Sequence, residues 1–183
     1  MAESTRADAR RNRERVLLAA RESFAENGFA VPLDEIAIRA GVGAGTVYRH
    51  FSTKEALFRA VVESRVNDLL TRARELADAP DAGAAFFEFL HDVGTQALAK
   101  RDVADAIELP GPMLEELHGA FAVLLVRAQH AGAVRSDIDL PDLIALLKGL
   151  LAAVAAAGSA AAGERVAAVL VDGLKASPPG STG

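Results

Sequence analysis

The sequence predicts an all-α protein. Apolar residues recur at 3.6-residue spacing along most of the chain, which is the period of a helix with one buried face. Glycines and prolines divide the chain into segments of helical length, and no segment alternates apolar and polar residues as a half-buried strand would. The chain of 183 residues is long enough to bury a substantial core in one or two domains.

The N-terminal segment is expected to combine a basic arm with a helix. Residues 1–11 are rich in arginine, and we expect them to form a flexible basic arm. A helix is expected over about 10–27, because one stripe collects Val16, Ala20 and Phe24, with Leu17 beside it. The helix is expected to end at Asn27 and Gly28, which is a common stop signal.

The second helix is expected over 33–40 and to be followed by a sharp turn. One face of this helix carries Leu33, Ile36, Ala37 and Ala40. Asp34 and Glu35 complement the positive end of its dipole. Gly41 occupies the turn, where a residue without Cβ reaches left-handed backbone angles at little cost. Such a turn holds the next helix at a steep angle.

A short helix is expected at about 44–50, and its outer face is suited to DNA. Only Val47, and Phe51 just beyond the helix, can turn inward. The small residues at its start let a surface approach the backbone, and the polar groups behind them can donate hydrogen bonds to phosphates. Segments 33–40 and 44–50 therefore predict a helix-turn-helix DNA-binding unit, in which the second helix reads the major groove. The alternative is an ordinary helical hairpin, in which Gly45 would cost about 1 kcal/mol relative to alanine.

The expected DNA contacts come from this reading helix and its flanks. Base edges are expected to meet Ala44, Gly45 and Thr46, together with Arg39 and Arg49. Phosphates are expected to be held by Tyr48, His50, Lys54, Arg10, Arg11 and Arg13. A run of arginines such as the N-terminal one can also be no more than a solvated helix face.

A long helix is expected to link the DNA-binding unit to the rest of the chain. Ser52 and Glu55 have the spacing of a capping box, and the helix they open runs to about Ala79, before Pro80. Further helices are expected at about 82–100, 102–109, 112–131, 141–157 and 161–176.

These elements suggest four parts of the chain. They are the arm at 1–11, a helix-turn-helix domain at 12–58, a helical ligand-binding and dimerisation domain at 59–176, and a tail at 177–183 with the composition of a disordered segment.

Two apolar helix faces near the C-terminus favour a homodimer. The first carries Leu143, Leu147, Leu150, Leu151 and Val154, and the second carries Val166, Val169 and Leu170. A helix-turn-helix protein usually reads two half-sites, and dyad-related helix pairs supply a suitable apolar surface. The alternative is a buried hairpin within one subunit.

A group of bulky residues in the middle of the chain is a candidate small-molecule pocket. Its members are Phe86, Phe89, Leu90, Met113, Leu117 and Phe121. The same residues would also be needed to fill a hydrophobic core, and no motif in this region identifies a ligand.

Composition and charge exclude several kinds of chemistry. The net charge is -5, and residues 1–58 hold nine basic against eight acidic residues, whereas residues 59–183 hold eleven against seventeen. The absence of cysteine excludes disulfides and thiolate chemistry. The four histidines do not form a metal-binding motif, and there is no phosphate-binding glycine loop or nucleophile elbow. We therefore expect neither an enzyme nor a metal cofactor.

The sequence is also expected to be that of a soluble, cytoplasmic protein with no membrane partner. The N-terminus lacks the apolar core of a signal peptide, and the apolar stretch at 149–163 is short for a membrane span.

The reading helix and its surroundings resemble a known family. The run AGVGAGTVYRHFSTKEALF, preceded by RERVLLAARESFAENGFA, resembles the DNA-binding domain of the TetR family of bacterial regulators over about residues 12–62. Its motif residues are Gly28, Phe29, Ala40, Gly41, Val42, Thr46, Tyr48, His50, Phe51, Lys54 and Leu57. The residue that opens the reading helix is often serine or threonine in this family and is Gly43 here, so some phosphate anchoring is expected to shift to Thr46 and Tyr48.

The resemblance implies a ligand-responsive regulator of transcription. It implies a four-helix dimer interface from the last two helices and an unknown small-molecule effector held in the helical domain. We expect a repressor that binds a palindromic operator in double-stranded DNA as a homodimer and is released by that effector. An activator with the same DNA chemistry is one alternative. A helical carrier or enzyme with an unused helix-turn-helix is another, but such a protein would be free to accumulate acids on the reading helix, and residues 44–51 contain none.

Overall fold

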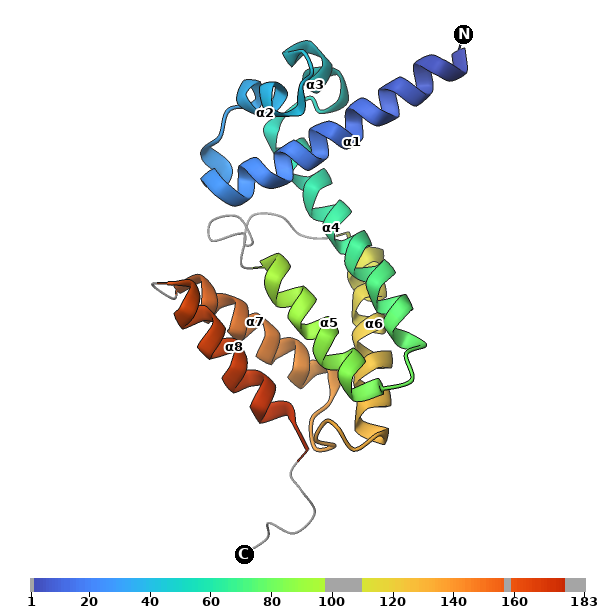
Figure 1. The fold of residues 1–183 in the computed structure, drawn as a ribbon, viewed down its shortest axis with the longest axis vertical. Coiled ribbons are helices and arrows are strands. Elements are labelled where there is room, and N and C mark those ends of the chain that lie inside the picture. Colours follow the sequence, from blue (N-terminus) through green and yellow to red (C-terminus); the bar gives the residue numbers. More distant parts are fainter. Residues whose placement is uncertain (1, 98–109, 157–158, 177–183) are drawn as a thin grey trace, which may run out of the picture. The chain divides into compact units, whose positions relative to one another are not determined.

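The structure is a computed structural model and describes residues 2–97, 110–156 and 159–176 (Figure 1). These residues form eight α-helices, so the predicted all-α class is confirmed for the part of the chain described. The helices divide into two compact units, and the division falls between Arg65 and Val66. It therefore lies inside the long helix, a little beyond the boundary at residue 58 expected from the sequence.

The first unit contains α1 (Ala2–Asn27), the 3-10 turn η1 (Gly28–Ala30), α2 (Leu33–Ala40), α3 (Ala44–His50) and the start of α4 (Lys54–Ala77). Its core includes the predicted inward residues of the first three helices, namely Val16, Ala20, Phe24, Ile36, Ala37, Ala40 and Val47. Phe24 and Phe29 both pack edge-on against Phe58 of α4, with ring centroids 5.1 and 5.6 Å from it. Aromatic packing therefore joins the first helix to the start of the long one.

Helix α1 begins at Ala2. The sequence predicts a flexible arm at residues 1–11 and a helix that starts near Arg10. Two pairs at helical spacing accompany this longer helix. Arg11 bonds to Asp8, and Nε of Arg10 lies 3.7 Å from Glu14. The three arginines assigned to the arm are consequently presented on a helix.

The turn between α2 and α3 has the predicted geometry. Gly41 has a φ of 63°, in the left-handed region. Its N–H donates to the carbonyl of Ile38 at 3.0 Å, and the N–H of Val42 donates to the carbonyl of Ala37 at 3.0 Å. This pair of bonds is a Schellman motif, which ends α2 and satisfies two of its last carbonyls.

Helix α4 is capped one residue later than expected. The hydroxyl of Thr53, not that of Ser52, accepts a hydrogen bond from the N–H of Ala56 at 3.1 Å. Hydrogen bonds from its own backbone N–H and from Thr53 hold the pKa of Glu55 below its ordinary value. The predicted capping function is therefore present, but Thr53 fills the position that the spacing had given to Ser52.

The second unit contains the remainder of α4 and α5 (Ala82–Ala97), α6 (Gly111–His130), α7 (Leu140–Ala156) and α8 (Ala160–Leu174). Helices α5 and α6 pack on each other, and α7 pairs with α8 (Figure 1). The starts of α5, α6, α7 and α8 agree with the predicted starts within one residue. The helix predicted at 102–109, the end of the one predicted at 82–100 and the tail at 177–183 lie outside the described residues.

Two arginines of α4 hold its second half against neighbouring helices. Arg72 bonds to Glu75 on its own helix and to Glu88 and Asp92 of α5. Arg74 pairs with Glu116 of α6.

From α6, Arg127 donates to the carbonyls of Leu76 and Ala79 at 3.2 and 2.8 Å. This last contact satisfies carbonyls at the end of α4 with a positive charge, which also suits the helix dipole.

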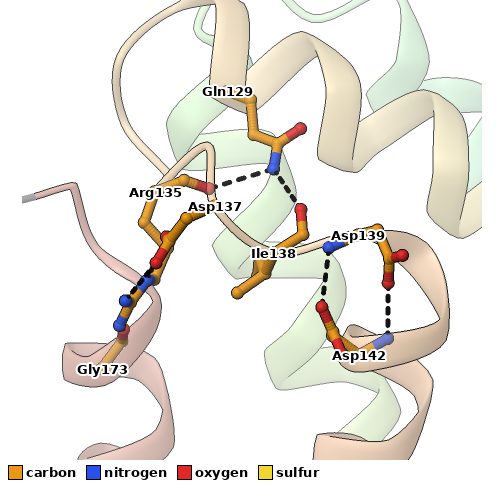
Figure 2. A network of polar contacts seen from close by, with 7 residues as sticks. All are labelled: Gln129, Arg135, Asp137, Ile138, Asp139, Asp142 and Gly173. Atoms are coloured by element: carbon orange, nitrogen blue, oxygen red, sulfur yellow. Dashed lines mark hydrogen bonds and ion pairs between the residues drawn. The ribbon is translucent and has the colours of Figure 1, made fainter.

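A polar network closes the end of the second unit (Figure 2). Gln129 donates to the carbonyls of Arg135 and Ile138. The guanidinium of Arg135 donates to both carboxylate oxygens of Asp137 and to the carbonyl of Gly173. This bond from Arg135 is the main cause of the lowered pKa of Asp137. An isolated antiparallel bridge between Val134 and Lys175 completes the closure.

Helix α7 starts with a reciprocal cap in the same network. Asp139 accepts from the N–H of Asp142 at 2.9 Å, and Asp142 accepts from the N–H of Asp139 at 3.1 Å. The loop between α6 and α7 is thus fixed at both ends by side chains, which positions α7 beside α8.

Candidate functional site

The outer face of α3 is the first candidate site. Val47 is fully buried and Phe51 nearly so, which anchors one side of this short helix to the core. Gly45, Tyr48 and Arg49 are exposed, and Ala44, Thr46 and His50 are partly exposed. The helix therefore presents small residues at its N-terminal end and hydrogen-bond donors behind them, as the sequence predicted.

Arg49 lies back along its own helix. Its Nε donates to the carbonyl of Gly45 at 3.0 Å, and one terminal nitrogen lies 3.4 Å from Oγ1 of Thr46. The guanidinium keeps further donors for a ligand, because Arg carries five N–H groups. The arrangement places a positive charge next to the Thr46 hydroxyl on the exposed side of the helix.

Arg39 is engaged within the protein. Its guanidinium bonds to Glu26 of α1 at 2.5 Å and lies 3.9 Å from Glu22. The hydrogen bond from Arg39 lowers the pKa of Glu26, so this carboxylate is ionised at neutral pH. In this structure the charge of Arg39, which the sequence predicts to meet a base edge, joins α2 to α1.

The basic residues that flank α3 lie on or beside aromatic rings. Nζ of Lys54 lies 4.8 Å from the ring centroid of Phe29, and Cζ of Arg13 lies 5.3 Å from that of Phe51. The ring of His50 lies 6.3 Å from the same Phe51 ring. Cation–π contacts of this kind orient a charge without neutralising it. Arg13 and His50 are thereby gathered around one ring at the end of the reading helix.

A cavity in the second unit is the second candidate site. It has a volume of about 350 Å³ and lies among α5, α7 and α8. Its wall is mostly aliphatic, and its polar side chains are His91, Glu164 and Asp172. Asp172 is paired with Lys175 at 2.8 Å. The size falls within the range of small-molecule sites.

The residues predicted to form the pocket are distributed differently. Of the six, only Leu90 lines this cavity. Phe86, Phe89 and Phe121 are buried in the core of the second unit, where the rings of Phe89 and Phe121 lie 5.0 Å apart. Leu117 is partly buried against that core, and Met113 is partly exposed. The three phenylalanines therefore fill the hydrophobic core, which was the alternative to a pocket.

An open apolar groove runs along the other side of α7 and α8. It is lined by Ile138, Asp142, Ala145, Leu146, Gly149, Leu150, Ala153, Val166, Val169 and Leu170. Val169 is 73% exposed and Leu146 is 40% exposed, which is unusual for aliphatic side chains on a helix that already has a buried face.

The residues predicted for the dimer interface fall on three surfaces. Val166, Val169, Leu150 and Leu170 line the open groove. Leu147, Leu151 and Val154 line the cavity, as Leu150 and Leu170 also do. Leu143 is fully buried in the core of its own unit.

Several site residues were missed from the sequence. In the groove they include Ala145, Leu146, Gly149 and Ala153, and in the cavity they include Gly94, Glu164, Ala167 and Val171. The residues Gly163, Ala167 and Val171 recur at four-residue spacing, which could have indicated a second face on α8. Helix α7 gives no such signal, because it is apolar on almost every side.

The described residues offer neither a metal site nor a membrane-spanning helix. No group of three or more acidic or histidine side chains among the described residues is arranged to hold a metal ion. In the described part of the chain, no helix is both long and apolar enough to cross a membrane.

Comparison with known proteins covers both units. Residues 16–61 match the family described as bacterial regulatory proteins, tetR family, and residues 81–176 match the family described as transcriptional regulator SbtR-like, C-terminal domain. The chain is 30% identical over 155 residues to the HTH-type transcriptional regulator UidR of Escherichia coli K12, which covers 76% of this chain and 77% of UidR.

Two further relatives inform the interpretation. The chain is 40% identical over 90 residues to the HTH-type transcriptional activator FasR of Mycolicibacterium smegmatis, covering 44% of this chain and 41% of FasR. The crystal structure of a TetR transcription regulatory protein from Mycobacterium vanbaalenii superposes with a TM-score of 0.72 at 42% identity, covering 93% of this chain and 99% of that one.

Proposed function

This chain belongs to the TetR family of bacterial transcriptional regulators, and we propose that it is a homodimeric repressor released from a palindromic operator by a small-molecule effector. Its family and relatives are DNA-binding regulators and not enzymes. Four features are proposed beyond membership of the family: repression, a palindromic operator, a homodimer and release by an effector.

The observation that carries the proposal is the outer face of α3. Val47 and Phe51 fix the helix to the core, while Gly45, Tyr48 and Arg49 face outward. Ala44, Gly45 and Thr46 offer a small N-terminal end that lets the backbone approach base edges in a major groove. Tyr48, His50 and the cations flanking the helix hold phosphates.

The second part of the proposal is the dimer. The open groove on α7 and α8 is apolar, contains small residues and exposes Leu146 and Val169. A second copy related by two-fold symmetry would cover this surface with the same surface, forming a four-helix interface. The two reading helices would then meet half-sites separated by about one helical turn or a multiple of it.

The third part is the effector. The cavity among α5, α7 and α8 is the site we propose for it. Helix α5 lines this cavity through Leu90 and His91 and holds Arg72 of α4 through Glu88 and Asp92. A ligand that shifts α5 therefore acts directly on the helix that continues into the DNA-binding unit. A coupling of about 1–3 kcal/mol between the two sites is enough for regulation.

The proposed place of action is the bacterial cytoplasm, because the protein must reach its operator DNA. An activator is the second candidate function, since FasR carries that name and the sign of regulation depends on where the operator lies relative to the promoter.

Selection of bound sequences from a random pool of double-stranded DNA tests the proposal. A palindrome should be enriched, and its binding should weaken in Thr46→Ala and in Tyr48→Phe at two salt concentrations. Leu114→Ala, an exposed residue of α6, serves as the control and should bind the palindrome as the unchanged protein does. Weak, salt-sensitive binding without an enriched sequence would contradict the proposal.

A transcription assay with the selected palindrome then separates the two signs of regulation. With the operator placed over a promoter, a repressor lowers transcript levels until effector is added, whereas an activator raises them from an upstream operator.

A further inference from the structure

The wall of the cavity is asymmetric in charge. Its polar side chains are one imidazole and two carboxylates, and none of its lining residues in the described part of the chain is a lysine or an arginine. Asp172 is neutralised by Lys175. Glu164, by contrast, forms no ion pair or hydrogen bond with any described residue.

The cavity is also elongated along α8. Gly163, Ala167 and Val171 line it on successive turns, and the last lies eight positions after the first. At 1.5 Å per residue this span is about 12 Å. Leu147, Leu151 and Val154 of α7 supply an aliphatic wall along the same space.

A carboxylate and an aliphatic channel select ligands by charge. An anion bound here would lose its hydration, would be repelled by Glu164 and would find no basic partner in the described wall. Its binding would therefore cost free energy. A cation would keep its charge compensated by Glu164 while its apolar part fills the channel. The wider surroundings act in the same direction, because residues 59–183 hold seventeen acids against eleven bases.

We propose that the cavity binds a hydrophobic cation, an elongated apolar molecule that carries an ammonium or related positive group held by Glu164. The inference rests on the proposed function only in treating the cavity as an effector site. It adds the class of ligand, and it predicts that a carboxylate of the same chain length binds more weakly than the cation.

Three probes of equal chain length test the charge preference on the full-length protein. Decyltrimethylammonium, decanol and decanoate share a ten-carbon chain that fits a channel of about 12 Å and differ in charge. Calorimetric titration, below the concentrations at which they form micelles, should give the tightest binding for the ammonium, weaker binding for the alcohol and the weakest for the carboxylate. Glu164 is exposed, and an ion pair at an exposed carboxylate predicts about a fivefold preference of the cation over the alcohol.

Two variants place the binding in the cavity. Glu164→Gln should remove most of the preference for the cation and leave decanol binding unchanged, whereas Glu115→Gln, on an exposed part of α6 away from the cavity, should change neither. Ala167→Phe should weaken all three probes by filling the channel. Circular dichroism of each variant confirms that it is folded.

Three results would overturn the proposal. They are decanoate binding as tightly as the ammonium, a cation preference that survives Glu164→Gln, and no binding of any probe. None of these titrations includes DNA, so a negative result for the charge preference does not bear on operator binding. In the same way, a failure to enrich an operator leaves the charge preference measurable.

Discussion

A terminal nitrogen of Arg15 on α1 lies 2.8 Å from the carbonyl oxygen of Gly41, in the turn between the two helices of the DNA-binding motif. A methyl group built on Gly41 would lie only 2.6 Å from the same nitrogen. The first helix thus holds the turn through its backbone, and the absence of a side chain at residue 41 makes room for this contact.

The first prediction concerns this pair. Gly41→Ala should lower the free energy of unfolding of the first unit by about 1–2 kcal/mol, because alanine is strained at a φ of 63°. Arg15→Ala should cost about 0.5–1 kcal/mol for the lost hydrogen bond. When Arg15 is already alanine, Gly41→Ala should lower the free energy of unfolding by less than it does in the otherwise unchanged protein, because the new methyl group then displaces no guanidinium.

Tyrosine fluorescence during urea unfolding measures these costs selectively. Tyr48 is the only tyrosine in the chain, which has no tryptophan, and it lies in the first unit. Arg10→Ala, whose partner Glu14 is also exposed, is the control and should have little effect. Strictly additive costs of the two substitutions would show that a methyl group at residue 41 does not disturb the contact with Arg15.

The second prediction separates Arg39 from the arginine on the reading helix. Arg39 is occupied by Glu26 and Glu22, so it releases no counterion when DNA binds. Arg39→Gln should therefore weaken operator binding without changing the slope of log affinity against log salt concentration. Arg49→Gln should lower that slope by about one unit, because its guanidinium forms no ion pair with a described carboxylate and so releases a counterion when DNA binds.

The measurement is a titration of the selected operator at four or more salt concentrations. A lower slope in Arg39→Gln would mean that the guanidinium leaves Glu26 and makes a charged contact with DNA in the complex. An unchanged slope in Arg49→Gln would mean that the charge of this side chain makes no contact with the DNA.

The third prediction concerns the end of α4. Arg127 is partly buried and donates to two carbonyls there, whereas Arg74 and Glu116 form an exposed pair. Arg127→Met, which keeps most of the aliphatic bulk, should lower the free energy of unfolding by about 1–3 kcal/mol, because two part-buried carbonyls lose their donors. Arg74→Met should cost less than about 1 kcal/mol.

Urea unfolding followed by far-ultraviolet circular dichroism gives both values. Equal costs for the two variants would mean that water replaces Arg127 at the end of the helix, and that the contact does not hold α4 against α6.

The sequence predicts those features of this protein that depend on local chemistry. The turn at Gly41, the length of α3 and the inward direction of Val47 were predicted because one glycine and one apolar period decide them. The partner of Arg39 could not be predicted, because Glu26 lies on another helix and is brought near only by tertiary packing.

The faces of α7 could not be assigned for a different reason. A helix that is apolar on almost every side has no polar face to mark what points outward. The predicted stripe combined Leu143, which is buried, with Leu151, which lines the cavity, and it omitted Leu146, which is exposed. The three phenylalanines predicted for the pocket present the same difficulty, because filling a core and lining a cavity require the same side chains.

The last prediction tests the proposed dimer surface through one of these omitted residues. Leu146 of α7 and Val169 of α8 are exposed and line the same groove, so a glutamate at both positions should place four carboxylates in a two-fold interface. Leu146→Glu with Val169→Glu should give a folded monomer in analytical ultracentrifugation. Its affinity for the palindrome should fall by about two orders of magnitude or more, since linked half-sites gain that much by avidity. Val123→Glu, at a half-exposed position of α6 outside the groove, should remain dimeric and bind normally. A double variant that is still dimeric would place the dimer contact on another surface, and the apolar groove between α7 and α8 would then need a different partner.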